Sequence, residues 1–214
     1  MLMKNLRDTE QIAALEQQMF LLRQKNKGKI VLFTSSRGKE GVSTIIFNLS
    51  LHIAEKYPER NILIIDANVN SPMLHTALNI PLSPGLNEAI KENRSLAESI
   101  HVVPSSCSIH VVPSGSNGVV KKVITPEVFS SFLANIESRY DWILIDAPPI
   151  LESADALSII NIADMIFLVV QAHKTTSDVV SKTKTYLEKQ DCIIDGVILN
   201  RVRKVIPDWL YKRL

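Results

Sequence analysis

The chain has 214 residues, of which 46% are hydrophobic and 21% are charged, and its formal net charge is +2. This balance is typical of a soluble globular protein and excludes a disordered or fibrous chain. The length suits one domain, and so small a net charge does not indicate a nucleic-acid partner, so we expect none.

Cysteine usage and hydropathy indicate an intracellular protein. Cys107 and Cys192 match neither a CxxC pair nor a zinc-binding spacing, so a reducing cytosol is the simplest compartment. The chain has no run that reaches the roughly 18 apolar residues of a membrane-spanning helix. We therefore expect a cytoplasmic protein, in which any membrane contact comes through a partner or a surface patch.

Residues 1–28 are predicted to form an amphipathic helix and a polar hinge. Between polar residues, apolar side chains recur at helical spacing: Ile12, Leu15, Met19 and Leu22. Such a stripe indicates a helix over residues 8–26 that packs on the domain or on a partner.

Short apolar runs alternate with helical segments through residues 29–205. The runs with strand character are 30–33, 61–65, 109–112, 142–145, 165–170 and 193–199. Strands that are apolar on both faces and alternate with helices predict an α/β fold, with a mostly parallel sheet flanked by helices on both faces. Ligands of such sheets bind at the carboxyl ends of the strands. Residues 206–214 form a short C-terminal tail.

The segment from Ser35 to Thr44 joins a predicted strand to a predicted helix, as a phosphate-binding loop requires. The pattern GxxxxGK[ST] is half present, because Ser36 replaces the first glycine and Val42 stands in the lysine position. On its own, this loop is a weak signal. The candidate nucleotide-binding residues are Arg37, Gly38, Lys39, Glu40, Gly41, Ser43, Thr44, Asn200 and Arg201.

Two aspartates follow apolar runs, Asp66 after one and Asp146 after another. At the same edge of the sheet they would offer the oxygen ligands of a magnesium ion that bridges phosphates, and Ser43 would add a hydroxyl. An aspartate after a strand is by itself more often a helix cap or a turn residue. Together with the loop, the pair predicts a residual catalytic and magnesium site.

Longer phrases resemble a known family. The stretch from Asp66 to His75 is similar to the acidic motif DADxRxPxxH of bacterial tyrosine kinases of capsule and exopolysaccharide export, and the stretch from Tyr140 to Pro149 to their Walker B strand. Further matches are Pro84-Gly85-Leu86, Val112-Pro113-Ser114-Gly115, Asp155-Ala156-Leu157 and Leu199-Asn200-Arg201-Val202.

The similarity extends from about residue 14 to residue 203. It implies a P-loop NTPase fold of the ParA/MinD type, with ATP or ADP and magnesium as cofactors. It also implies a membrane chain-length or co-polymerase protein of polysaccharide export as the partner.

Three residues depart from the family pattern at the site. Val42 replaces the loop lysine, Asn68 replaces the second aspartate of the acidic motif, and Asn70 replaces its arginine. One lost charge-assisted hydrogen bond costs about 1.5–3 kcal/mol, or roughly one to two factors of ten in nucleotide binding. Catalysis should suffer more, since the transition state depends on such cations. We therefore expect a regulator with weakened nucleotide binding and little or no kinase activity.

Two other functions stay open. Arg37, in the position of the ParA/MinD signature lysine, or Lys39 would sustain an active tyrosine autokinase with Tyr211 as a target, unless both are solvated loop cations. The third function is a ParA/MinD-like positioning ATPase. A homo-oligomer is a further expectation, although Met19 and Leu22 replace both arginines of the family's ExxRxxR oligomerisation pattern and put its ring assembly in doubt.

Overall fold

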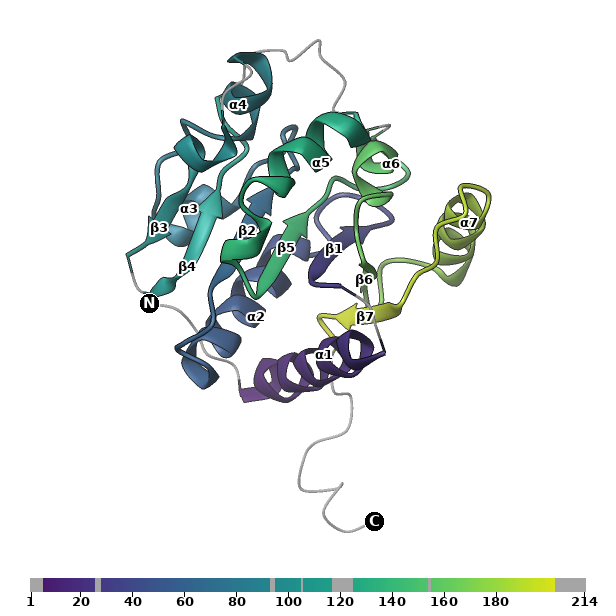
Figure 1. The fold of residues 1–214 in the computed structure, drawn as a ribbon. Helices are drawn as coiled ribbons and strands as arrows, with labels where there is room; N and C mark the ends of the chain where they lie inside the picture. The colour runs from purple at the N-terminus through teal and green to yellow at the C-terminus, as the bar shows by residue number, and fades with distance from the viewer. Residues whose placement is uncertain are drawn as a thin grey trace.

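A seven-stranded sheet in the order β3-β4-β2-β5-β1-β6-β7 runs through the computed structural model (Figure 1). The structure describes residues 6–25, 28–92, 95–104, 106–116, 125–153 and 155–202. The strands are β1 (Ile30–Ser35), β2 (Ile62–Asp66), β3 (His101–Val103), β4 (Ser106–Val112), β5 (Trp142–Asp146), β6 (Met165–Gln171) and β7 (Gly196–Asn200). Neighbouring strands are parallel except for the antiparallel pair β3–β4.

Helices cover both faces of this sheet. They are α1 (Leu6–Gln24), α2 (Val42–Lys56), α3 (Leu74–Leu78), α4 (Leu86–Glu92), α5 (Pro126–Ala134), α6 (Asp155–Ile160) and α7 (Ser177–Glu188), with the 3-10 turns η1 (Leu96–Ser99) and η2 (Glu137–Arg139). The predicted fold class, a mostly parallel sheet flanked by helices on both faces, is confirmed. Within the described chain, no helix combines the length and the apolar character needed to cross a membrane.

The core lies in two layers, one on each side of the sheet. Side chains of a strand alternate between faces, so Val31 and Phe33 of β1 pack toward α1, α2 and α3, whereas Leu32 packs toward α4, α5, α6 and α7. Phe33 stacks on Phe167 of β6 with ring centroids 5.5 Å apart. This two-sided burial explains why the central strands are continuous apolar runs in the sequence.

The N-terminal helix α1 packs on the domain itself, against α2. Three of the four predicted apolar positions are buried, and the stripe is interrupted by Glu16, whose side chain is only 2% exposed. Its carboxylate accepts hydrogen bonds from Lys56 Nζ at 2.8 and 3.0 Å and lies 3.0 Å from His52 Nε2. A buried carboxylate is tolerated only when it is paired, so these contacts fix α1 in one register on α2.

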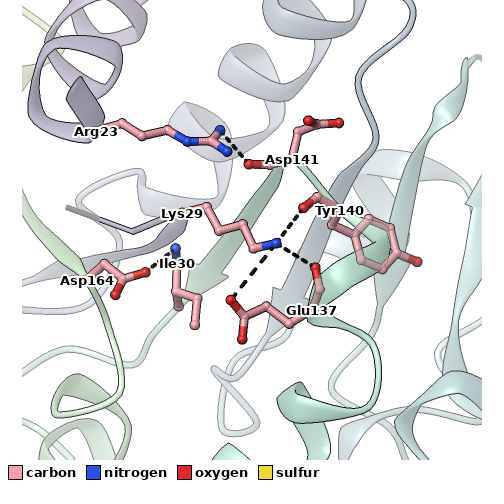
Figure 2. Close-up of polar contacts among 7 residues, drawn as sticks. All are labelled: Arg23, Lys29, Ile30, Glu137, Tyr140, Asp141 and Asp164. Atoms are coloured by element: carbon pink, nitrogen blue, oxygen red, sulfur yellow. Dashed lines mark hydrogen bonds and ion pairs between the residues drawn. The ribbon is translucent and has the colours of Figure 1, made fainter. Parts of the chain in front are cut away.

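Polar contacts fasten the edge of the sheet opposite to the strands' carboxyl ends (Figure 2). Lys29 Nζ donates to the carbonyl oxygens of Glu137 and Tyr140 at 2.8 and 3.0 Å, and Arg23 Nη1 of α1 donates to the carbonyl oxygen of Asp141 at 2.9 Å. These carbonyls belong to the segment that leads into β5. The contacts therefore hold α1, the start of β1 and the start of β5 together.

Replacing Lys29 by methionine should destabilise the fold, because two carbonyl oxygens lose their donor. We expect Lys29→Met to lower the free energy of unfolding by about 1–3 kcal/mol, measured by urea denaturation. Lys184→Met is the matched control, since Lys184 is 66% exposed on α7, and it should change stability by less than about 0.5 kcal/mol. Equal effects of the two substitutions would contradict a structural role of Lys29.

Candidate functional site

The loop between β1 and α2 has the backbone shape of an anion-binding loop. Lys39 and Gly41 have φ angles of 67° and 99°, which lie in the left-handed region. A Cβ on Gly41 would lie 2.1 Å from Asn200 Nδ2, which itself donates to the carbonyl oxygen of Glu40 at 2.9 Å. Glycine is therefore required at position 41, and Asn200 holds the loop through its backbone.

The side chain of Glu40 fixes the loop from within. It is 3% exposed, and its Oε2 accepts from the backbone N–H groups of Ser36 and Arg37 at 3.0 and 3.4 Å. Its Oε1 accepts from the hydroxyl of Thr175, in the turn after β6. Thr183 of α7 donates to Ser36 Oγ at 2.9 Å. The loop is thus shaped by the protein's own groups and is connected to the segment between β6 and β7.

Asp66 and Asp146 lie side by side, because parallel pairing makes them register partners at the ends of β2 and β5. Asp66 is 0% and Asp146 1% exposed. Asp66 Oδ1 accepts from the N–H of Asn68 at 3.1 Å, and the hydroxyl of Ser43 donates to Asp146 Oδ2 at 2.5 Å. The second oxygen of each carboxylate, Asp66 Oδ2 and Asp146 Oδ1, is buried without a hydrogen-bond partner. The structure therefore brings the three predicted magnesium ligands together.

Burial governs the protonation of this pair. It raises the pKa of Asp66 to about 7, although backbone N–H groups of Asn68, Leu74 and Met73 act in the opposite direction. Burial and the neighbouring charge of Asp66 raise the pKa of Asp146 well above its usual range, against the hydrogen bond from Ser43. Two carboxylates out of water resist being charged together unless a cation lies between them.

These residues fit a magnesium ion. Two unpaired carboxylate oxygens and a hydroxyl are hard oxygen ligands of the kind Mg²⁺ binds, and Mg²⁺ usually keeps water and phosphate oxygens as its other ligands. The described residues contain no cluster of three or more acidic, histidine or cysteine side chains that could hold a metal ion. Asn68 Oδ1 is a further buried oxygen without a partner.

A cleft of about 680 Å³ opens over the loop, a volume in the range of small-molecule sites. Its lining includes seven of the predicted nucleotide-binding residues: Gly38, Lys39, Glu40, Gly41, Ser43, Thr44 and Arg201. Arg37 is exposed outside this lining, and Asn200 lies behind the loop. The cleft is therefore of a size for a nucleotide, with the loop as one wall.

All three departures from the family pattern lie at this cleft. Val42, Asn68 and Asn70 are among the residues that line it. Val42 begins α2, is 8% exposed and packs in the same core layer as Ile45 and Ile46. An apolar side chain therefore stands where a P-loop places its cation.

Sequence reasoning missed two charged residues of the cleft, Glu152 and Lys174. Glu152 Oε2 accepts from the backbone N–H of Gly38 at 3.0 Å, so a carboxylate lies on one of the loop amides that would face a phosphate. Glu152 follows Asp146 by six residues, and the strand-end rule points to this segment. Lys174 lies three residues after the end of β6. It belongs to no phosphate-binding or acidic motif, so the sequence alone gives no reason to select it.

Over most of its length the chain is similar to a family model, to known proteins and to solved structures. A family model described as an AAA domain matches residues 28–191. Tyrosine-protein kinase CpsD of Streptococcus agalactiae serotype III (strain NEM316) is 31% identical over 185 residues, which span 86% of this chain and 78% of that protein. The solved kinase domain of VpsO has a TM-score of 0.79 at 28% identity, covering 92% of this chain and 97% of that chain. The cell division protein MinD of Aquifex aeolicus has a TM-score of 0.68 at 21% identity, covering 87% and 73%, and thus shares the fold.

The paired carboxylates predict an unusual pH dependence of stability. Asp66 releases its proton at about pH 7 in the folded state, against an ordinary pKa of 3.8, so the folded state binds more protons between these values. Stability without a divalent cation should therefore fall as pH rises from about 4 to 7, by roughly 2–4 kcal/mol. Asp66→Asn should make this slope shallower in urea denaturation at a series of pH values.

Magnesium should reduce the same slope in the wild-type chain and should have little effect on Asp66→Asn. Asp178→Asn is the control, since Asp178 is exposed in the first turn of α7, and it should keep the wild-type slope. Identical slopes for the wild-type chain and Asp66→Asn would contradict the raised pKa.

Proposed function

Because the chain belongs to the AAA-domain family and, within it, to the bacterial tyrosine kinases of capsule and exopolysaccharide biosynthesis, we propose that it is a regulator of polysaccharide export with weak or lost kinase activity. The observation that carries the proposal is Val42, packed in the core at the start of α2. The loop therefore lacks the cation that a P-loop places on the β- and γ-phosphates. The backbone amides and the magnesium ligands remain.

Phosphoryl transfer is impaired more than nucleotide binding in this proposal. A preplaced cation stabilises the charge that develops on the transferred phosphoryl group, and this contribution is larger in the transition state than in the ground state. Asn68 adds a second defect, because its amide cannot accept the proton of an attacking tyrosine hydroxyl. Two separate steps of the reaction thus lack a group.

Glu152 is a second reason to propose that nucleotide binding is weak. Its carboxylate accepts from the Gly38 N–H group at 3.0 Å and brings a negative charge into the cleft where phosphates would bind. A phosphate must displace this carboxylate and tolerate its charge. The Gly38 N–H group therefore already has an acceptor within the chain.

The partner in this proposal is a membrane chain-length or co-polymerase protein of the export machinery, which would bring the chain to the inner face of the membrane. Family membership supports it. A regulatory role of this kind requires a folded surface that a partner can bind, and it does not require rapid phosphoryl transfer.

The alternative of an active autokinase rests on Lys39, which lines the cleft, whereas Arg37 does not. Tyr211, the target in that alternative, lies outside the described residues. A positioning ATPase has only the common fold with MinD in its favour.

A titration of the purified chain with ATP and ADP plus magnesium tests the proposal. We expect Val42→Lys to bind MgATP about 10–100-fold more tightly than the wild-type chain, by calorimetry. Val42→Met is the matched control, since it lengthens the side chain without adding a charge, and it should gain nothing. Submicromolar binding and clear phosphotyrosine formation by the wild-type chain would overturn the proposal.

A second substitution tests the carboxylate on the loop. Glu152→Gln keeps an acceptor for the Gly38 N–H group but removes the charge, and we expect about three- to tenfold tighter MgATP binding at low ionic strength. The gain should shrink in high salt. Glu188→Gln on α7, where Glu188 is 56% exposed, should leave the affinity unchanged. An unchanged or weakened affinity of Glu152→Gln would show that the carboxylate does not oppose phosphate.

A further inference from the structure

Three cationic side chains line the cleft within the described chain: Lys39, Lys174 and Arg201. We propose that Lys174, in the turn between β6 and α7, is the phosphate-binding cation that replaces the lysine missing at position 42. This inference rests on the proposed nucleotide site and identifies the residue that binds the anionic part of its ligand. It also assigns a role to a segment in which the sequence shows no motif.

The backbone around Lys174 is held against the phosphate loop. The hydroxyl of the next residue, Thr175, donates to the carboxylate of Glu40 inside the loop. On the other side, the N–H of Ala172 donates to the carbonyl oxygen of Asn200 at 2.9 Å, and Asn200 Nδ2 bonds the carbonyl oxygen of Glu40 at 2.9 Å. The turn and the loop are thus tied at two points, which keeps the origin of the Lys174 side chain beside the cleft.

The ammonium group of Lys174 is available for a ligand. Its side chain is exposed, and among the described residues it has no hydrogen bond or ion pair. The guanidinium of Arg201 is different, because Nη1 donates to Gln171 Oε1 at 3.3 Å. A lysine on a flexible stem is a compact charge that can follow a phosphate over several positions.

Lys39 is the competing cation, since it lines the same cleft and its side chain also lacks a partner in the described part of the chain. It starts from the loop itself, whose amides would bind the phosphate, and so approaches from the same wall. Lys174 starts from a different element and adds a contact that the loop cannot make. The lysine of a P-loop acts as a point charge added to the ring of amides, and Lys174 would supply the same charge from outside the loop.

The test is MgATP binding by the 214-residue chain with single and double substitutions. We expect Lys174→Ala to weaken binding about 10–100-fold, the loss of one charge-assisted contact. Lys174→Arg should retain most of the affinity. Lys182→Ala is the matched control on α7, because Lys182 is exposed and outside the cleft lining, and it should bind as the wild-type chain does.

A double-mutant cycle tests whether Lys174 replaces the missing cation. In a Val42→Lys background, Lys174→Ala should cost several-fold less than in the wild-type chain, because the two cations would serve the same phosphates. If Lys39→Ala loses affinity and Lys174→Ala does not, or if the cost of Lys174→Ala is the same in both backgrounds, the inference is wrong and the proposed function stands. If neither the wild-type chain nor Val42→Lys binds MgATP at millimolar concentration, the nucleotide site itself is refuted.

Discussion

Parallel pairing of β2 with β5 sets Asp66 beside Asp146 at the ends of both strands, where neither carboxylate reaches water. The pair costs stability, since a charged form of both groups would lack a counter-ion and each carboxylate leaves one oxygen without a partner. Two apolar residues at these positions would make the fold more stable. A proton held on one carboxylate relieves this cost, in keeping with the raised pKa of both groups, and the proposed magnesium ion would relieve it in another way.

The loop between β1 and α2 differs from this pair, because its polar groups have hydrogen-bond partners within the chain. Its backbone N–H groups have an acceptor within the loop, because the Glu40 carboxylate accepts from the N–H groups of Ser36 and Arg37. The same carboxylate accepts from the hydroxyl of Thr175. A phosphate loop is commonly described as a cradle of free amides, but here the chain supplies part of the anion itself. The shape of the loop therefore depends in part on contacts within the chain.

Most strands of the sheet could be predicted from the sequence, because each central strand is a short continuous run of apolar residues. Apolar runs and the polar residues that end them identify β1, β2, β5 and β6, and the parallel topology then brings Ser43, Asp66 and Asp146 to one edge. The antiparallel β3, three residues long and partly exposed, gives no such run. Similarly, the run predicted at 193–199 begins too early, because Ile193 is 74% exposed and β7 starts at Gly196.

Contacts between distant segments could not be predicted in this way. Glu152 reaches Gly38, and Thr175 reaches Glu40, across 114 and 135 residues of chain. Neither contact leaves a periodic signal, since both come from turns whose positions are set by the packing of other elements. The buried Glu16 on α1 is a further case, because a carboxylate within an apolar stripe reads as a solvent-facing residue until its partner Lys56 is known.

The cations of the cleft separate binding from catalysis. A lysine at the start of α2 would lie among the loop amides, shielded from water, where its interaction with developing charge is strongest. Lys39 and Lys174 are exposed residues of the cleft lining, one on the loop and one after β6, so water screens part of their charge. Such cations stabilise bound phosphates in any state about equally, and an interaction that is equal in ground and transition state raises affinity without raising the rate. Under the proposed function, the cleft would therefore bind a nucleotide without rapid phosphoryl transfer, as a regulator requires.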